Sequence, residues 1–457
     1  MFKKILYFAS VIVIFSSFNF RDNIPPSGWY QQFMPSLGNA TLSDISFPDS
    51  LIGYASTTRD TNTHNSYILK TTNGGDNWFV SLTDNGNRNF VKIIFINKDT
   101  GFAAAKFSFK SNGTLYKTTN AGINWITIPN PLASFDYEDI AVINENILWC
   151  VEDDFFSGGA YLSTNGGLNW TRKFDGGNFN PVKIYMYNER IGFITRGTSS
   201  TSRFYKTTNS GDNWTLIPNT GGFDNLFFLD SLIGFKCQGF NLYKSSDGGL
   251  TWKDTIFKSF FSGGVAMGFR DFHAVNEDTI WGSGGYFFPG FKSIIPITTN
   301  GGNTWGYQIP HDSVTGEFSI ITFYNKNYGW MFRRTKNDMT NSFNGVHTVT
   351  GGDTIIHLVD IKQISTEIPI KFKLYQNYPN PFNPKTKISF SVKSQETKIG
   401  IKIYDISGKF ISELVNQNIS AGTYEVEFDG SNLSSGIYFY SLISDNFTET
   451  KKMMLIK

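Results

Sequence analysis

The chain has 457 residues, and its 40 basic and 38 acidic side chains leave a formal net charge of only +2. This balance gives no electrostatic reason to expect a nucleic acid or another polyanion as a partner. Apolar residues make up 40% and aromatic residues 16%, with 44 glycines. Such a composition excludes a disordered chain and a coiled coil, and it favours strands joined by tight turns.

The first 19 residues predict a secretory signal peptide. Lys3 and Lys4 precede an apolar stretch at 5–15, which is shorter than the roughly 20 residues that a membrane-spanning helix needs. A membrane anchor is the alternative interpretation. Beyond this segment we expect no transmembrane span. Only two cysteines, Cys150 and Cys237, follow, so disulfides are not expected to hold this exported chain together.

A nine-residue pattern, KTTNGGDNW at 70–78, recurs six times with 38 to 53 residues between successive tryptophans. A period near 45 residues is typical of a four-stranded propeller blade. The pattern supplies a turn, because Asn or Asp bonds nearby backbone and glycine adopts positive φ. Its characteristic residues are Asn73, Trp78, Asn120, Trp125, Asn165, Trp170, Asn209, Trp214, Asp247, Trp252, Asn300 and Trp305.

A second pattern, an apolar strand followed by a turn and an aromatic residue, occurs seven times. Residues 347–355 (HTVTGGDTI) align with the nine-residue pattern as a degenerate seventh copy. We therefore predict an all-β fold with a seven-bladed propeller over residues 20–360. Two segments could close its ring: Gly28-Trp29-Tyr30, which resembles the start of a fourth strand, or Ile355–Asp360. The sequence leaves both open.

The recurring S/T-x-D/N-x-G-x-T/N-W pattern resembles the Asp-box, or BNR, repeat of sialidases, some xyloglucan-cleaving enzymes, sortilin-type receptors and photosystem II assembly-factor-like propellers. The resemblance implies a propeller in which the box is a structural turn away from any active site. It implies no particular function.

The composition changes near residue 361. We expect a linker at 361–371 and a small Ig-like antiparallel β-sandwich at 372–457, with prolines in its YPNPFNP segment at 378–384. YPNPFNP, IYDISGK at 403–409, LSSGIYFY at 433–440 and the terminal KKMMLIK resemble the C-terminal sorting domain of type IX secretion substrates.

That resemblance implies the type IX secretion machinery as a partner and secretion to the surface of, or release from, a Gram-negative bacterium. An ordinary terminal domain without a sorting role is the alternative. The candidate sorting residues are Gly436, Lys451, Lys452 and Lys457.

A search for catalytic and metal-binding patterns finds none. The five histidines lack metal-ligand spacing, and no nucleophile elbow or phosphate loop is present, so we expect no metal, cofactor or catalytic residues. An F/Y-R-I-P motif of sialidases is also absent. Acidic residues at 136, 138–139 and 153–154 are the candidates for a glycosidase pair, and a solvated surface is their simpler explanation.

The B–C and D–A loops of the blades are expected on one face, opposite the Asp-box turns. Because these loops vary in length and sequence, we expect the ligand there. The candidate ligand-binding residues are Tyr286, Phe287, Phe288, Phe291, Arg333 and Arg334. Packing at the rim of the ring is the alternative role for these aromatics, since all ten tryptophans fit repeated packing positions.

The favoured function is a secreted, non-catalytic propeller that binds a glycan or a protein. An exported carbohydrate-active hydrolase with atypical acids is the second hypothesis. A periplasmic assembly factor is the third, and the sorting module argues against it.

Overall fold

The computed structural model describes residues 28–457, apart from short segments at 108–112, 133–134, 153–157, 177–180, 197–201, 253, 263–264, 288–291, 311–313, 315, 334–343, 353–354, 358–361, 394–396, 432 and 445. The predicted signal peptide thus lies outside the described residues. Within the described part, every regular element is a β-strand.

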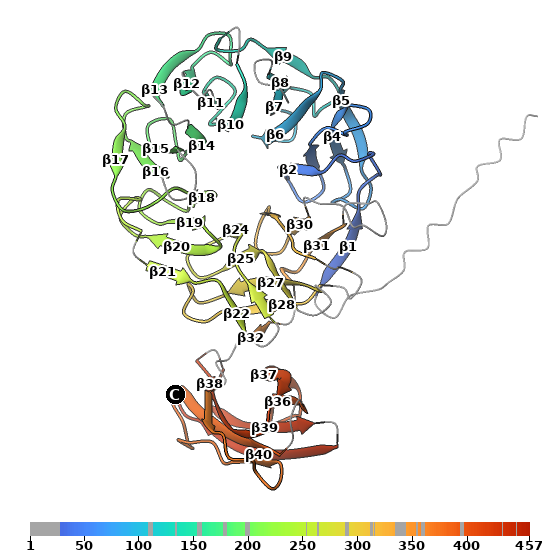
Figure 1. The fold of residues 1–457 in the computed structure, drawn as a ribbon, viewed down its shortest axis with the longest axis vertical. Coiled ribbons are helices and arrows are strands. Elements are labelled where there is room, and N and C mark those ends of the chain that lie inside the picture. The colour runs from blue at the N-terminus through green and yellow to red at the C-terminus, as the bar shows by residue number, and fades with distance from the viewer. Residues whose placement is uncertain are drawn as a thin grey trace, which may run out of the picture.

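The strands at 29–348 form seven four-stranded antiparallel blades in a ring, as predicted (Figure 1). Blade 1 contains β2 (Leu42–Ser46), β3 (Gly53–Thr57), β4 (Ser66–Thr71) and β5 (Phe79–Asp84). Blade 2 contains β6 (Arg88–Phe95), β7 (Gly101–Phe107), β8 (Thr114–Thr118) and β9 (Ile126–Ile128). Blade 3 contains β10 (Tyr137–Val142), β11 (Leu148–Glu152), β12 (Gly159–Ser163) and β13 (Thr171–Asp175). Blade 4 contains β14 (Pro181–Met186), β15 (Gly192–Arg196), β16 (Arg203–Thr207) and β17 (Thr215–Ile217).

The remaining blades follow in chain order. Blade 5 contains β18 (Asn225–Phe228), β19 (Gly234–Gln238), β20 (Asn241–Ser245) and β21 (Asp254–Phe257). Blade 6 contains β24 (Asp271–Ala274), β25 (Ile280–Ser283), β27 (Lys292–Thr298) and β28 (Gly306–Gln308). Blade 7 contains β29 (Ile320–Phe323), β30 (Gly329–Phe332), β31 (Asn344–Thr348) and, as its outer strand, β1 (Trp29–Phe33).

The N-terminal strand therefore closes the ring. Trp29 lies opposite Thr348 in the β1–β31 pair, and its indole Nε1 donates to Oε1 of Gln308 at 2.9 Å. The other candidate segment, Ile355–Asp360, is not the outer strand of blade 7. Its described part contributes β32 (Ile356–His357), which pairs with β28 of blade 6 instead.

Blade 6 is larger than the repeat predicts. Its D–A connection contains β22 (Phe260–Ser262) and β23 (Val265–Met267), and its B–C connection contains β26 (Gly285–Phe287). These strands pair with one another and, through β26, with β27. These two connections are therefore partly regular, because added strands can satisfy their backbone groups on β27, which extends beyond its blade.

Each Asp-box turn is built by the same local hydrogen bonds. In blade 1, the Thr71 hydroxyl donates to Oδ1 of Asn73 at 3.0 Å and accepts from the amide of Gly75 at 2.9 Å. Oδ1 of Asn73 also accepts from the amide of Asn77 at 3.0 Å. Gly75 has φ +98°, which explains the glycine at this position.

The box tryptophans connect neighbouring blades. In four blades the indole N–H donates to the outer strand of the preceding blade or to the residue just after that strand. In blade 5 the indole N–H donates instead to a carbonyl of its own Asp-box turn. These bonds join Trp125 to Ser81 Oγ, Trp170 to Pro129 O, Trp214 to Lys173 O and Trp305 to Ile256 O. All ten tryptophans lie in the described part of the chain, and each is buried or half-buried, which supports their use in packing.

Cys150 and Cys237 are both buried and free. Burial raises the pKa of each thiol well above its usual value. The expectation that they do not pair is confirmed.

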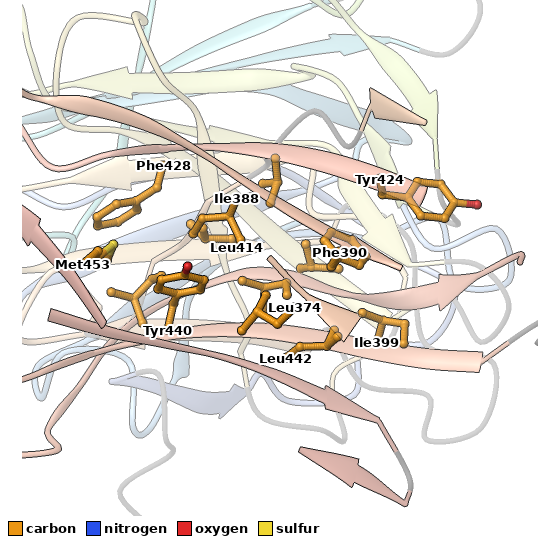
Figure 2. Close-up of a cluster of buried hydrophobic side chains, with 14 of the residues drawn as sticks. Leu374, Ile388, Phe390, Ile399, Leu414, Tyr424, Phe428, Tyr440, Leu442 and Met453 are labelled. Atoms are coloured by element: carbon orange, nitrogen blue, oxygen red, sulfur yellow. The ribbon is translucent and has the colours of Figure 1, made fainter. Parts of the chain in front are cut away.

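The C-terminal strands form two four-stranded sheets packed as a sandwich. One sheet contains β33 (Lys362–Ser365), β38 (Gly422–Asp429), β35 (Lys385–Val392) and β34 (Lys373–Leu374), in that order. The other contains β37 (Phe410–Ile419), β36 (Thr397–Asp405), β39 (Gly436–Ser444) and β40 (Phe447–Leu455). Their facing side chains make one core, which includes Ile388, Phe390, Tyr440, Leu442 and Met453 (Figure 2).

Residues 361–371, expected to be a linker only, contribute β33 to this sandwich. Gln363 lies opposite Tyr424 of β38. The sandwich therefore begins about ten residues before the predicted boundary, because a short edge strand can pair with a partner some 60 residues away.

Candidate functional site

A cavity of about 860 Å³ opens at the mouth of the central channel, on the variable-loop face, where the B–C and D–A loops of the blades lie. We call it the mouth cavity. Five consecutive blades supply its walls, and most of its polar side chains are hydroxyls and amides. These neutral groups are Thr41, Ser43, Thr58, Asn89, Thr195, Ser202 and Gln238. Among the hydrogen-bonding side chains of the cavity, these seven neutral groups therefore outnumber the four charged ones, Lys106, Glu138, Lys183 and Asp224.

A smaller cavity of about 200 Å³ lies deeper in the channel. Lys183, Phe223 and Asp224 line both cavities and so form the constriction between them. Asp224 accepts a hydrogen bond from the amide of Gly239 at 3.1 Å. In contrast, no hydrogen bond or ion pair with the described residues engages the Lys183 ammonium group. Lys183 can therefore donate to a ligand in the channel.

Acidic side chains deeper in the channel cap the exposed edges of the inner strands. Oδ2 of Asp44 accepts from the amide of Ile93 in the next blade at 3.0 Å, and Oδ2 of Asp139 accepts from that of Ile184 at 3.1 Å. Asp271 accepts in the same way from an amide of blade 7. The side chains of Ser46, Tyr185 and His273 also accept hydrogen bonds from inner-strand amides of the blade that follows their own. These bonds satisfy edge N–H groups that would otherwise be unpaired.

Charge and burial in this ring shift several pKa values. Lys92, whose Nζ lies 3.5 Å from Oδ2 of Asp44, has its pKa raised, chiefly by that carboxylate. Burial raises the pKa of Asp271 and lowers that of His273 to about 4. His273 is therefore neutral at physiological pH, consistent with its Nδ1 accepting the amide of Phe323.

The acidic residues considered for glycosidase chemistry are engaged in fixed contacts. Asp136 accepts from the amide of Phe107 at 2.7 Å, and Glu138 pairs with Lys106 at 2.5 Å. Asp139 caps Ile184, as described above. Asp153 and Asp154 lie outside the described residues. Within the described part of the chain, no group of three or more His, Cys, Asp or Glu residues could hold a metal ion.

Lys236 on β19 is a fully buried lysine beside the mouth cavity, with 0% of its surface exposed. Its ammonium group donates to the carbonyls of Thr220 and Gly222 and to Oε1 of Gln238. Three aromatic rings surround it at 5.4–5.6 Å, those of Phe204, Tyr243 and Trp252. Because Gly222 and Gln238 line the cavity, Lys236 holds part of its wall in place.

Burial lowers the pKa of Lys236 to about 8, from about 10.5. Burial therefore disfavours the charged form in the folded state only. Lys236 lowers the free energy of unfolding most below pH 8, and this loss disappears as the pH rises to 10.5. We expect the unfolding free energy of the wild type to rise over this interval relative to Lys236→Met, by up to about 3 kcal/mol. Urea unfolding of both proteins at several pH values measures it. A pH-independent difference would contradict the burial argument.

The predicted ligand-binding residues are only partly described. Tyr286 lies half-buried on β26, opposite Ala266 and Ser293, and Phe287 follows it on the same strand. Arg333 is half-buried, and its guanidinium lies against Gly316. Phe288, Phe291 and Arg334 lie outside the described residues. A ligand site at this cluster stays a prediction.

Sequence reasoning did not identify the mouth cavity, Lys183 or Lys236. Lys183 had one available signal, a charged residue in an inner strand that otherwise reads as apolar. Lys236 had a similar signal, a lysine between Phe235 and Cys237 in a strand of mostly buried residues.

In the C-terminal sandwich, the YPNPFNP segment covers the edge of β40. The amide of Phe382 donates to the carbonyl of Met454 at 2.9 Å, and the amide of Ile456 donates back to Phe382 at 3.0 Å. This contact covers the end of an edge strand that could otherwise pair with another chain. It gives the YPNPFNP segment and the terminal KKMMLIK a shared structural role.

The candidate sorting residues lie on two neighbouring strands. Gly436 begins β39, and a Cβ added there would keep 3.9 Å from its nearest neighbours. Lys451 is half-buried beside Glu449, while Lys452 and Lys457 are exposed. Their role in recognition by the secretion machinery stays a prediction.

Residues 376–457 match the family model described as the secretion system C-terminal sorting domain. This module is a type IX sorting domain. It indicates secretion of the protein to the cell surface or the medium and implies interaction with the type IX machinery. In the part of the chain that the structure describes, no helix is long and apolar enough to cross a membrane.

The propeller is similar to solved structures at low sequence identity. One, described as YCF48 bound to D1 peptide, has a TM-score of 0.53 and 17% identity, over 71% of this chain and 97% of that one. A GH74 xyloglucanase from Xanthomonas campestris has a TM-score of 0.51 and 11% identity, over 79% of this chain and 59% of the enzyme. The chain thus spans about three-fifths of that enzyme. No curated protein matches the sequence. These similarities support the propeller fold alone.

Proposed function

We propose that the propeller is a non-catalytic glycan-binding module, which the type IX sorting domain delivers to the cell surface or the medium. The observation that carries this proposal is the mouth cavity of about 860 Å³, whose polar side chains are mostly neutral hydroxyl and amide groups. Such groups complement the many donors and acceptors of a saccharide. The Lys183 ammonium, which has no hydrogen-bond or ion-pair partner among the described residues, adds a charged donor at the bottom of the cavity.

The contacts in the channel favour a glycan over an extended peptide. An extended peptide can bind a sheet by adding a strand to a free edge. Here Asp44, Asp139 and Asp271 already bond edge amides of inner strands. The remaining recognition groups in the cavity are side chains, which suit hydroxyls.

The contacts also favour binding over hydrolysis. A glycosidase needs a pair of carboxyl groups flanking the scissile bond, one of them able to donate a proton. Asp136, Glu138 and Asp139 instead accept bonds from fixed backbone amides or a lysine. The similar structures concern a peptide and a xyloglucanase respectively, so the choice of ligand rests on the cavity and not on them.

A binding screen on the full-length mature protein tests the proposal. The protein is applied to an array of neutral and acidic oligosaccharides and, in parallel, to a peptide array. Each glycan that binds is then incubated with the protein and analysed for new reducing ends, which would indicate cleavage. We expect saturable binding to one glycan class without cleavage. Cleavage would support the hydrolase hypothesis, and binding to peptides alone would overturn the glycan assignment.

Lys183→Met tests whether the ligand reaches the constriction. We expect its affinity for the bound glycan to fall about tenfold or more, because a hydrogen bond from a charged donor contributes about 1.5–3 kcal/mol. Ile123→Ala, at a position 75% exposed on an Asp-box turn at the opposite face, is the control and should keep wild-type affinity. Isothermal titration calorimetry measures both. Equal affinities for the wild type and Lys183→Met would exclude Lys183 from the site.

A further inference from the structure

The hairpin tip between β19 and β20 has an unusual residue in a strained conformation. Gln238 pairs with Asn241, which leaves a two-residue turn of Gly239 and Phe240. Both have positive φ, +56° and +68°. Turns of this kind favour Asn, Asp and Gly, because a bulky side chain clashes with its own backbone in the left-handed region. A phenylalanine here is therefore unfavourable for the turn itself.

Phe240 is not placed there to fill the core. Its side chain is 43% exposed on the variable-loop face. The preceding residues, Gln238 and Gly239, line the mouth cavity. Phe240, which follows these two lining residues in the turn, is therefore next to the rim of the proposed glycan site.

The surroundings hold this aromatic ring in place. The guanidinium carbon of Arg270 lies 4.9 Å from the ring centroid, and Nε of Arg270 donates to Oε2 of Glu317 at 2.7 Å. The carbonyl of Phe240 accepts from the amide of Phe269 at 2.9 Å. Gly268 packs so closely that a Cβ there would lie 2.9 Å from Cβ of Phe240. Strained residues that neighbouring contacts fix in this way are common at ligand-binding positions.

We infer that Phe240 and Arg270 form a sugar-stacking subsite at the rim of the mouth cavity. This inference rests on the proposed glycan-binding function and names its outer contact. The C–H face of a pyranose ring packs on the exposed part of Phe240, and guanidinium N–H groups of Arg270 donate to its hydroxyls. The next sugars of the oligosaccharide then extend over Gly239 into the hydroxyl-lined cavity. The ligand class is a neutral oligosaccharide long enough to span the rim and the cavity.

Phe240→Asn tests the subsite, because asparagine suits the left-handed turn and removes the ring. Gel electrophoresis through separate gels containing hydroxyethyl cellulose, xyloglucan, galactomannan or xylan measures binding as retardation of the full-length protein. For the polysaccharide that retards the wild type, we expect about a tenfold loss of affinity in Phe240→Asn. Phe240→Trp, which keeps an aromatic platform, should bind at least as tightly as the wild type.

Phe79→Asn is the matched control, since Phe79 is 49% exposed and follows the Asp-box turn on the opposite face. The retardation of Phe79→Asn should equal that of the wild type, and the melting temperature of Phe240→Asn should be no lower than that of the wild type. If the wild type is retarded and Phe240→Asn is retarded equally, the subsite is wrong while glycan binding stands. If the wild type is retarded in none of the four gels, the subsite and the choice of a neutral glycan both fail.

Discussion

Replacing Trp29 with alanine will lower the free energy of unfolding by about 3–5 kcal/mol, the range for truncating a fully buried tryptophan. Trp29 is the first residue of the strand that closes the ring, and its ring meets Phe323 edge-on at 6.0 Å. Its loss also leaves Oε1 of the buried Gln308 without this donor. Denaturant unfolding followed by tryptophan fluorescence measures the change.

Phe33→Ala on the same strand is the control for this effect. Phe33 is 54% exposed at the end of β1, so we expect its replacement to change the unfolding free energy by no more than about 1 kcal/mol. A similarly small effect for Trp29→Ala would mean that β1 does not close the ring in solution.

Deleting residues 376–457 will stop the protein from reaching the cell surface and the medium. The deleted residues are those that match the sorting-domain family, and the propeller with its closing strand remains whole. Cells with an active type IX system, expressing either form, are separated into periplasm, membrane and medium and probed for the propeller. We expect the shortened chain to accumulate in the periplasm.

Point substitutions separate recognition from folding in the same assay. Gly436→Ala fits the space at the start of β39, so a loss of export would report contact with the machinery and not a packing defect. Lys452→Glu tests the exposed lysine on β40. Lys387→Ala removes an ion pair with Glu425 that lies within the sheet opposite to the one holding Gly436 and Lys452, and this variant should be exported normally. Surface delivery of the deleted form at the wild-type level would refute the role of the module.

The blade number could be predicted from the sequence because each Asp-box turn is a local structure. The bonds of Asn73 reach only residues within four positions, so they leave a recognisable pattern. The ring closure could not be chosen in the same way. Trp29 pairs with Thr348, more than 300 residues away, and only the assembled ring distinguishes it from the segment at 355–360.

The candidate site was less predictable because it is formed by many blades together. The mouth cavity takes one or a few side chains from each of five blades, and no segment contains enough of them to make a motif. Sequence reasoning expected the ligand on the variable-loop face and favoured the aromatic residues of those loops, and this expectation stays a prediction. It did not single out Phe240, because the positive φ that makes a phenylalanine there unusual depends on the two-residue turn.

Hydrogen–deuterium exchange with and without the glycan identified by the array tests the central claim most directly. If the mouth cavity is the binding site, ligand will slow exchange at amides around 41–43, 220–224 and 238–241, all on the variable-loop face. Exchange at the Asp-box turns on the opposite face will stay unchanged. Protection confined to the box turns or to the C-terminal sandwich would contradict the proposal.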